Sequence, residues 1–499
     1  MTGTIMQPGV KALWDDVESR VAAGDRFAGL FATRPTEVAG SVGVAGSAGV
    51  AGVAGSAPIT LSAHLATAGG IDTLEAALPP GAESYPALTP RLGAAFWYER
   101  EIHDTFGVVP EGHPRLAPLV RPCSPETPGD RALPRHVTGY GMFTIPHGPV
   151  RSGVLESIEY LVETPGEAIP HLNMRVFYKH RGVQDAFAGM TPADAVLLAE
   201  RTEGIASVAH ALAFSHAIEQ IAGCEPPMTA QLVRVLHAEL ERIANHLDVA
   251  VRLADAAGLA VATARLALHK ERVMRLVSRL CGSRFGRGVV VPGGITAAPL
   301  LPPAQLRAEL DQLAKPIAAD AAALMATSSF LDRLRGTGPL TPERARQHGA
   351  LGPIGKAAWP ADDARLARPY DAYRALAVPS ARSHRAGDAL ARLRVRWEEV
   401  DQSFRLLRQV ADDLAERAPD PYSVTCQPAS GRAVGWSEAP QGEVLYDVRL
   451  EAGHITRCHP RSASFHNLVL MHEVFAGDIL TDFPFIEASF GLSVAGVTL

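Results

Sequence analysis

The sequence has few cysteines, and none of them lies near another. The chain of 499 residues contains Cys123, Cys224, Cys281, Cys426 and Cys458, with no Cys-x-x-Cys pair. Iron–sulfur clusters and structural zinc sites need closely spaced thiolates, so the sequence indicates neither in this chain. We therefore expect reduced thiols scattered through the core of a cytoplasmic protein.

Basic blocks and strongly apolar segments are also missing. The formal net charge is −6 and no run of five Lys or Arg occurs, which argues against a nucleic-acid partner. Charged residues interrupt the first 35 residues before an apolar run can form, so no secretory leader is indicated. The uncharged run Val38–Ala57 contains only Val, Ala, Gly and Ser. This composition predicts a flexible surface loop and no transmembrane span.

The remaining composition predicts a globular protein of two or three domains. Apolar residues make up 47% of the chain and charged residues 20%, which is enough for sizeable cores. The first part alternates short helical and strand-like stretches. Four prolines without periodicity then mark residues 120–135 as a linker. We predict a first domain over 1–122, a linker over 123–137 and a second domain over 138–499.

The segment Phe96–Gly107 predicts an amphipathic helix. Tyr98, Ile102 and Phe106 recur every four residues and form an apolar stripe with charged residues opposite. Together with the Gly-His-Pro tripeptide at 112–114, this string resembles the signature of the small hydrophilic subunit of complex I.

The second domain begins with strands and continues mainly as helices, two of them long enough to predict a helical bundle. Gly148-Pro149 predicts a turn. Thr191 and Pro192 form a strong helix start, from which one helix can run to Gln220. Further elements are predicted as strands over Leu155–Thr164, Met174–Tyr178 and Ser437–His459, and as helices over Thr229–Ala256, Ala304–Leu334, Glu343–Gln347 and Ala386–Arg417.

Three polar side chains fall on one face of the helix predicted over 191–220. Glu203, Ser207 and His210 are spaced by four and three residues on an otherwise Ala- and Leu-rich helix. Glu203 is either an exposed carboxylate or a buried, hydrogen-bonded one, since an unpaired buried carboxylate is costly. His210 is either a hydrogen-bonded core histidine or a catalytic group.

Two segments resemble the metal-binding motifs of a known family. Residues 201–206 read Arg-Thr-Glu-Gly-Ile-Ala, and Asp-Phe-Pro at 482–484 is followed by Ser-Val-Ala-Gly at 493–496. They are similar to the Arg-x-Cys-Gly-x-Cys and Asp-Pro-Cys-x-x-Cys motifs of nickel–iron hydrogenase large subunits. The resemblance places the family's metal-ligand positions, none of them a cysteine here, at Glu203, Ala206, Ser493 and Gly496. Such a centre needs soft thiolates, so we expect no metal and no hydrogen chemistry.

Further segments extend the resemblance over most of the chain. They are Ile-Pro-His-Gly-Pro-Val at 145–150, Lys-His-Arg-Gly at 179–182, Pro-Gly-Gly at 292–294, Gly-Pro-Ile-Gly at 352–355 and Glu-Ala-Pro-Gln-Gly-Glu at 438–443. The ordered set is similar to the large subunits of group 4 membrane-bound hydrogenases and formate hydrogenlyases, which carry the small complex I-like domain in front. The resemblance implies an α+β fold, with an N-terminal α/β domain, a small β-sheet and a mainly α-helical bundle.

Some family residues are replaced. Gln184 and Gln441 stand where the family has charged residues, and the quinone-binding histidine and tyrosine of complex I fall on the 151–155 segment and near Ala209 or His210. The quinone pair is therefore not carried over. Arg151 is either a surface charge that stabilises the turn or a pocket cation. The residues that remain as candidates for one polar, water-accessible pocket are Arg151, Ser152, Glu203, Ser207, His210 and Ser493.

The resemblance favours a subunit of a complex I-like or formate hydrogenlyase-like oxidoreductase that passes electrons to a quinone-type or other acceptor. It implies membrane subunits and an iron–sulfur partner subunit, and a peripheral position on the inner face of the cell membrane. We expect no cofactor on this chain, although the pocket has the polarity for a quinone. One alternative is a structural scaffold with a vestigial active site. An active hydrogenase with unusual ligands is a weaker one, because Ala206 and Gly496 offer no ligand atom.

Overall fold

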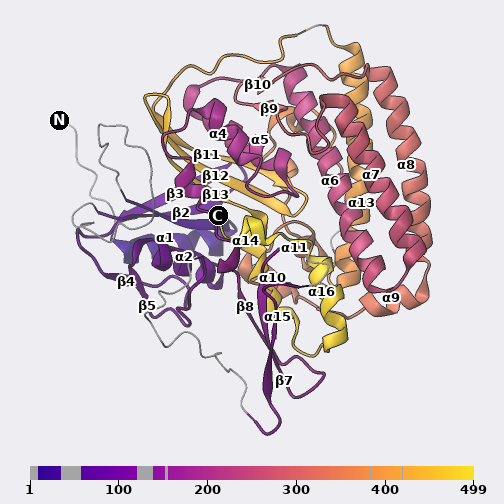
Figure 1. Ribbon diagram of the computed structural model, residues 1–499. Coiled ribbons are helices and arrows are strands. Elements are labelled where there is room, and N and C mark those ends of the chain that lie inside the picture. The colour runs from indigo at the N-terminus through magenta and orange to yellow at the C-terminus, as the bar shows by residue number, and fades with distance from the viewer. Residues whose placement is uncertain (1–8, 35–57, 121–138, 152–155, 381–383, 419) are drawn as a thin grey trace, which may run out of the picture. The chain divides into compact units, whose positions relative to one another are not determined.

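The computed structural model describes residues 9–34, 58–120, 139–151, 156–380, 384–418 and 420–499 (Figure 1). The predicted loop over 38–57, the predicted linker over 123–137 and the candidate Ser152 lie outside the described residues. The chain forms two compact units, residues 1–121 and 122–499. Both units combine helices with sheets, which confirms the predicted α+β fold class.

The first unit is a small antiparallel sheet with two helices. The sheet has the order β1-β2-β3, and a short parallel pair joins β4 to β5. Helix α1 packs against the sheet and buries Leu13, Trp14 and Val17. The elements of this unit are α1 Val10–Ala23, β1 Arg26–Thr33, β2 Thr60–Ala66, β3 Ile71–Ala77, β4 Ser84–Pro86, the 3-10 helix Gly93–Ala95, α2 Phe96–Phe106 and β5 Val109–Glu111.

Helix α2 confirms the helix predicted in this segment, but it is buried more completely than its pattern indicates. It ends at Gly107, whose φ of 74° glycine adopts without strain. Glu99 and Arg100 are buried together with the apolar stripe. The Glu99 carboxylate accepts hydrogen bonds from the N–H groups of Leu88 and Thr89. The charged residues opposite the apolar stripe are therefore not all solvated, because Glu99 and Arg100 bond to neighbouring loops.

Two three-stranded antiparallel sheets belong to the second unit, with the orders β6-β7-β8 and β11-β12-β13. Their strands are β6 Phe143–His147, β7 Glu159–Thr164, β8 His171–Arg175, β11 Gly431–Ala439, β12 Gly442–Glu451 and β13 His454–Arg461, and a separate hairpin pairs β9 Val290–Val291 with β10 Gly294–Ile295. The strand predicted over 155–164 is confirmed from Glu159 onward, while residue 155 lies outside the described residues. The strands predicted over 437–459 are confirmed. The strand predicted over 174–178 is wrong beyond Arg175. Arg175 pairs with Glu159, the first residue of β7, so no residue of β7 remains to pair with residues 176–178.

Four long helices form a large hydrophobic core in the second unit and lie side by side in Figure 1. They are α6 Met228–Ala256, α7 Ala260–Cys281, α8 Pro303–Met325 and α13 Ala389–Glu416. Leu247, Val273, Leu310 and Phe404, one from each helix, belong to the same buried cluster. The helices predicted over 229–256, 304–334, 343–347 and 386–417 are confirmed, the second of them as two helices, whereas α7 was not predicted.

Shorter elements complete the second unit. They are α3 Val183–Ala186, α4 Pro192–Ala199, α5 Ser207–Ala222, α9 Ser328–Leu334, α10 Pro342–His348, α11 Gly352–Ala358, α12 Ala364–Ala367, α14 Ala463–Leu468, α15 Met471–Val474, α16 Phe483–Phe490, and the 3-10 helices η3 Phe177–Lys179, η4 Asp371–Arg374, η5 Leu480–Asp482 and η6 Val494–Gly496. Within the described residues, no helix has both the length and the apolarity that crossing a bilayer requires.

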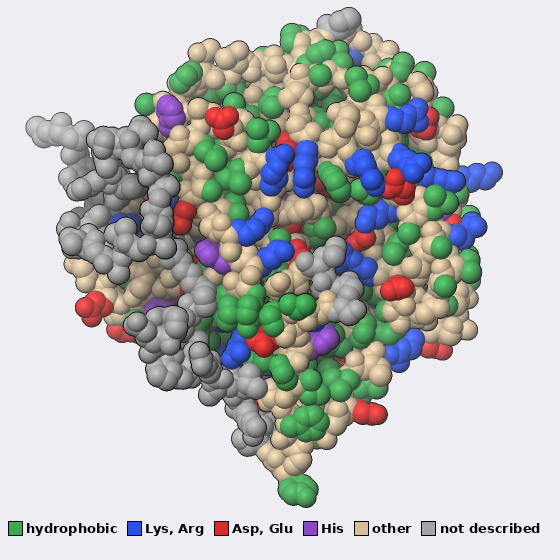
Figure 2. Space-filling model, viewed as in Figure 1, with side chains coloured by type: hydrophobic (Ala, Val, Ile, Leu, Met, Phe, Trp, Pro, Cys, Tyr) green, Lys and Arg blue, Asp and Glu red, His purple; other side chains and the backbone are tan. Residues whose placement is uncertain are grey.

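Lys and Arg side chains are spread over the bundle face visible in Figure 2, with acidic side chains between them. Helix α7 carries several of these pairs: Arg265 bonds to Asp320, and Arg279 lies 2.8 Å from Glu309. The positive charge of this helix is therefore largely compensated by carboxylates of neighbouring helices.

The helix predicted over 191–220 is two helices separated by a turn. Helix α4 starts as predicted, because the Thr191 hydroxyl accepts a hydrogen bond from the Asp194 N–H. It ends at Ala199, and α5 starts at Ser207. The break arises because the buried Glu200 bonds to the N–H of Gly288, in another segment. The prediction that Glu203, Ser207 and His210 share one helix face is therefore wrong, since residue 203 lies in the turn.

Helix α5 lies directly on strand β11, and this contact fixes the position of its N-terminus. A Cβ atom on Gly435 would lie 2.0 Å from the carbonyl oxygen of Ala213 and 2.5 Å from the nitrogen of Ala217. Both atoms belong to the α5 backbone, so only glycine permits this approach. The sheet thus holds the start of α5 against the turn that carries Glu203.

One pair of cysteines contradicts the expectation of scattered reduced thiols. Cys224 and Cys426 form a disulfide, with their Cα atoms 5.7 Å apart. Cys281 and Cys458 are free, and Cys123 lies outside the described residues. The bonded cysteines are 202 residues apart, so their spacing in the sequence gives no sign of the pair. Tertiary contact between the end of α5 and the segment before β11 brings them together.

We expect Cys224→Ser to lower the free energy of unfolding by about 2–4 kcal/mol, because the disulfide restricts the unfolded chain. Denaturant unfolding without reductant measures this change. Cys281→Ser is the matched control and should leave the unfolding midpoint nearly unchanged. Thiol titration of the unfolded chain should find two more thiols after reduction than before it, and equal counts would show that the disulfide is absent.

Candidate functional site

Two segments far apart in the sequence meet in a buried cluster of hydrogen bonds. Glu203 comes from the turn between α4 and α5, and Ser493 from the segment after α16. The Ser464 hydroxyl joins them, since it donates to Glu203 Oε1 at 2.5 Å and accepts from the Ser493 N–H at 3.1 Å. Glu203 is fully buried and Ser493 is 3% exposed. The structure thus brings these two candidate residues together.

The other two ligand positions of the resemblance belong to the same place. Ala206 is buried, and its N–H donates to the Glu203 carbonyl. The Gly496 carbonyl accepts from the Ser462 hydroxyl. A Cβ atom on Gly496 would lie 2.8 Å from Glu203 Cδ and 2.9 Å from Ser462 Oγ. The Glu203 side chain therefore fills the space between the two segments.

His210 extends this cluster toward the sheet. Its Nε2 atom lies 3.1 Å from Glu203 Oε2, and its Nδ1 atom lies 2.9 Å from the Tyr446 hydroxyl, which bonds to the Thr202 hydroxyl. A proton on Nε2 satisfies every bond, because the ring then donates to the carboxylate and accepts from the phenol. Burial raises the pKa of Tyr446 well above its usual value, so the phenol keeps its proton. We call Thr202, Glu203, His210, Tyr446, Ser464 and Ser493 the Glu203 cluster.

Arg181 holds the two segments together from the side. Its guanidinium donates to the carbonyl oxygens of Thr202 and Ala495 at 2.5 Å and 2.6 Å. Burial lowers its pKa, while the negative charges of Glu156 and Glu203 oppose this shift. The arginine of the 179–182 motif thus joins both halves of the site.

Glu156 is a site residue that the sequence analysis missed. Its carboxylate accepts from the Ser493 hydroxyl and from the N–H groups of Val494 and Ala495. It therefore caps the start of η6, where a negative charge is favourable. No local pattern marks this residue, because its partners lie more than 300 residues further along the chain.

Two other candidates lie apart from the cluster. Ser207 accepts a hydrogen bond from Arg287 at 3.4 Å and lines a separate cavity. Arg151 is paired with both carboxylate oxygens of Glu487 and lies over the Tyr160 ring at 4.9 Å. It is thus neither a free surface charge nor a partner of Glu203.

The expectation of one water-accessible pocket is therefore wrong. Glu203 and His210 are fully buried, and their polar atoms bond to each other and to neighbouring side chains. A carboxylate and an imidazole have stayed in the interior because each has found hydrogen-bond partners there.

The donor set does not fit a nickel–iron centre. Ala206 and Gly496 have no ligand atom, and the oxygens of Glu203 are engaged by Ser464 and His210. Among the residues that the structure describes, no group of three or more His, Cys, Asp or Glu side chains is arranged to hold a metal ion.

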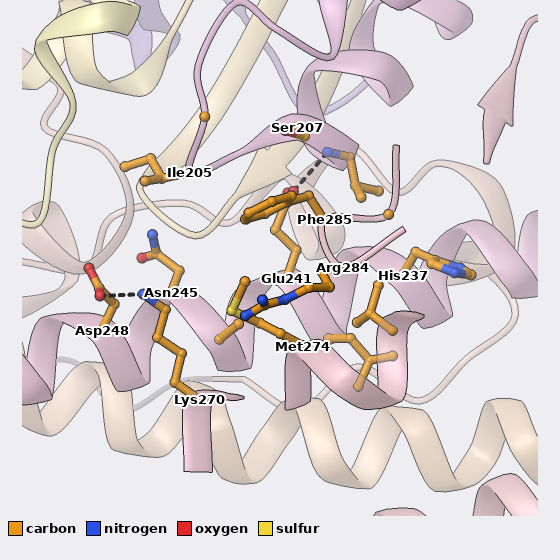
Figure 3. A pocket seen from close by; sticks show the side chains of 16 residues that line it. Ile205, Ser207, His237, Glu241, Asn245, Asp248, Lys270, Met274, Arg284 and Phe285 are labelled. Atoms are coloured by element: carbon orange, nitrogen blue, oxygen red, sulfur yellow. Dashed lines mark hydrogen bonds and ion pairs between the residues drawn. The ribbon is translucent and has the colours of Figure 1, made fainter. Parts of the chain in front are cut away.

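A cavity borders the turn at 200–206 and the start of α5 (Figure 3). Gly204, Ile205 and Ser207 line it from the turn, and α6, α7 and residues 284–286 line the remainder. Glu241 of α6 reaches the turn from this side, and its carboxylate accepts hydrogen bonds from the N–H groups of Val208 and Ala209. The buried Glu203 and the partly exposed Glu241 thus both lie close to this part of the chain.

Family comparisons match both units of the chain. Residues 50–129 match the respiratory-chain NADH dehydrogenase 30 kDa subunit, and residues 258–427 match the 49 kDa subunit. The chain is thus similar to both complex I subunits, with the two segments fused in that order. The resemblance inferred from the sequence is thereby confirmed.

Relatives of this fused complex I-type chain include subunits of several enzymes. Formate hydrogenlyase subunit 5 of Escherichia coli is 27% identical over 81% of this chain and 75% of its own length. The membrane-bound hydrogenase alpha subunit of Pyrococcus furiosus is 28% identical over 69% of this chain and 84% of its own. A C/D polypeptide of the NADH-quinone oxidoreductase of Gluconacetobacter diazotrophicus, also a fusion by its name, is 24% identical over 87% and 82%.

A solved structure shows the same fold. A chain of the membrane-bound sulfane sulfur reductase, an archaeal respiratory membrane complex, superposes with a TM-score of 0.68. The match covers 72% of the complex I-type chain and 99% of that chain, at 23% identity.

The space beside Gly496 gives a test of the site geometry. We expect Gly496→Ala to lower the free energy of unfolding by about 1–3 kcal/mol, because the added methyl group meets the Glu203 carboxyl group. The loss should be smaller in the Glu203→Ala background, with a coupling of about 0.5–3 kcal/mol in a double-mutant cycle. Gly204→Ala is the matched control, because no atom lies within 4 Å of its added Cβ. Additive effects would place the Glu203 side chain elsewhere.

Proposed function

We propose that the chain is the large subunit of a membrane-associated, complex I-like oxidoreductase that transfers electrons without hydrogen chemistry. The observation that carries this proposal is the Glu203 cluster. The four positions to which the resemblance assigns the metal ligands lie together here, and a carboxylate, hydroxyl groups and an imidazole occupy the space. In this proposal the scaffold of the hydrogenases is kept and a hydrogen-bonded network stands in place of the metal donors.

The named relatives support a place in a multi-subunit assembly. They are subunits of formate hydrogenlyase, of membrane-bound hydrogenase and of NADH-quinone oxidoreductase. We infer that membrane subunits and an iron–sulfur subunit accompany this chain, and that it lies at the cytoplasmic face of the membrane. The acceptor in this proposal is a quinone or another small oxidant bound near the turn at 203–207, and the chain itself carries no cofactor.

A structural scaffold with a vestigial site is the second candidate. The closed packing of the Glu203 cluster favours it, because a fully buried carboxylate and imidazole have no direct access to a substrate. The two candidates differ in whether the cluster affects turnover.

Purification of the intact complex from membranes tests the proposal. We expect iron–sulfur and membrane subunits to copurify with the chain, electron transfer from a reduced donor to a soluble acceptor, and no hydrogen evolution. Elemental analysis should find far less than one nickel per chain, because thiolate ligands are missing. Stoichiometric nickel or hydrogen evolution would contradict the proposal, and a complex without any electron transfer would leave the scaffold function.

A further inference from the structure

Glu241 lines the cavity and bonds to the backbone at the start of α5. Its Oε2 atom accepts from the Val208 N–H at 2.7 Å, and its Oε1 atom accepts from the Ala209 N–H at 3.1 Å. Helix α5 has no side-chain cap at its own N-terminal residue, so this carboxyl group satisfies two of its free N–H groups. Glu241 is among the side chains that line the cavity (Figure 3).

No cation forms an ion pair with Glu241 among the described residues. The cations around it bond to other groups. Arg242 of α6 pairs with Glu239 and Glu399, and Lys270 of α7 pairs with Asp248 of α6. After α7, Arg284 pairs with Glu271, and Arg287 donates a hydrogen bond to Ser207. Burial raises the pKa of Glu241 to about 8, the two N–H groups and Arg242 oppose this shift, and the charge of Glu203 adds to it. The charge of Glu203 therefore affects proton binding at Glu241.

The cavity lining is mostly apolar, but it includes two polar side chains that lack a hydrogen-bond partner. The Asn245 Oδ1 atom and the His237 Nε2 atom, both in side chains that line it, are buried without a hydrogen-bond partner. Asn245 is 8% exposed and His237 is 2% exposed. The cavity volume of about 120 Å³ exceeds what one water molecule occupies. Ordered water would satisfy both atoms and connect them with Glu241 and the Lys270–Asp248 pair at its rim.

We propose that this cavity is a proton-exchange site, in which Glu241 takes up or releases a proton as the charge at the Glu203 cluster changes. Uptake joins a proton from cavity water to the Glu241 carboxylate and forms the carboxylic acid, and release reverses this step. The inference rests on the proposed function in one respect, since electron transfer supplies the change of charge. The coupling between the two carboxyl groups does not depend on it.

Linkage makes the coupling reciprocal. Negative charge on Glu203 strengthens proton binding at Glu241, so a proton on Glu241 favours negative charge at the Glu203 cluster by the same free energy. An electron that arrives near the cluster therefore retains or attracts a proton at Glu241, and its departure releases that proton to the cavity.

Infrared spectroscopy of the full chain tests the inference without turnover. The carbonyl band of a protonated carboxylic acid is followed from pH 5 to pH 10 in H2O and D2O. We expect a component that titrates near pH 8, shifts within the mixing time in D2O and is missing in Glu241→Gln. Glu203→Gln should lower its midpoint, because one negative charge that raises the pKa of Glu241 is lost.

Glu438 provides a matched control. Its pKa is also raised to about 8, by burial and by Asp363. It is 3% exposed and lies near Lys356, and it does not line the cavity. Its band should exchange slowly in D2O, disappear in Glu438→Gln and keep its midpoint in Glu203→Gln.

Three results would overturn the proposal. They are a Glu241 component that titrates near pH 4.5, one that exchanges as slowly as the Glu438 component, and a midpoint that is unchanged in Glu203→Gln. Turnover of the assembled complex should change with pH near pH 8, where Glu241 gains or loses its proton. Glu241→Gln should remove this change, whereas Glu438→Gln should retain it. If the complex shows no turnover at all, the proposed function fails, and the infrared result still decides the coupling.

Discussion

Arg365→Ala is expected to prevent stable folding of the second unit. Arg365 is fully buried, and its guanidinium donates to Asp363 at 2.7 Å and to Glu239 at 3.0 Å. Burial alone would raise the pKa of Glu239, but Arg365 and Arg242 hold it below its usual value. Removal of Arg365 leaves two buried carboxylates with one cation fewer. Such a loss costs about 3–5 kcal/mol, a large part of the 5–15 kcal/mol that stabilises a typical domain.

Soluble yield and denaturant unfolding measure this effect. Arg405→Ala is the matched control, because Arg405 pairs with Asp401 on the exposed side of α13 with 58% of its side chain accessible. Its loss should change the free energy of unfolding by no more than about 0.5–1 kcal/mol. An Arg365→Ala chain with the yield and midpoint of the unmodified protein would show that the buried network is not needed for folding.

Glu203→Gln and His210→Ala are expected to reduce electron transfer by the assembled complex about tenfold or more, if the cluster takes part in moving protons. Glu203→Gln keeps the shape of the side chain and its contact with Ser464 but removes the charge. His210→Ala breaks the chain of hydrogen bonds between Glu203 and Tyr446. Both variants should still assemble, because neither residue lies at the surface.

Turnover of the purified complex, compared at equal amounts of every subunit, measures this loss. His269→Ala is the control, because His269 is a buried histidine that bonds to a carboxylate, Asp320, outside the site. It should lower stability without a comparable loss of turnover. Full turnover in Glu203→Gln and His210→Ala would leave only the scaffold function.

Local interactions explain which elements could be predicted. The start of α4 follows from Thr191 and Asp194, because a hydroxyl and an N–H three residues apart meet whenever a helix begins there. Helix α6 follows from its apolar spacing, and α7 carries a comparable pattern with Leu266, Val273 and Leu280 buried. The sequence could therefore also have indicated α7, although the many arginines between the apolar residues make their helical spacing hard to recognise.

The turn at 200–206 shows where such reasoning stops. Helical spacing predicted one continuous face, but Glu200 and Glu203 each bond to another segment, and these bonds replace helical ones. The same limit applies to Glu156, whose partner Ser493 is 337 residues away, and to the disulfide. A pattern within a few residues carries no information about contacts of this range.

The sequence by itself indicated the family resemblance, the α+β class and the absence of cysteine at residues 203, 206, 493 and 496, because these are properties of residue identity and short-range spacing. Only the tertiary structure decided which side chains meet around these four positions. Glu203 fills the space beside Gly496 and Ser207 faces another cavity, because the path of the chain sets which polar groups meet once they leave water. Each buried polar group needs a hydrogen-bond partner in the interior, and the packing of the chain decides which group lies close enough to be that partner.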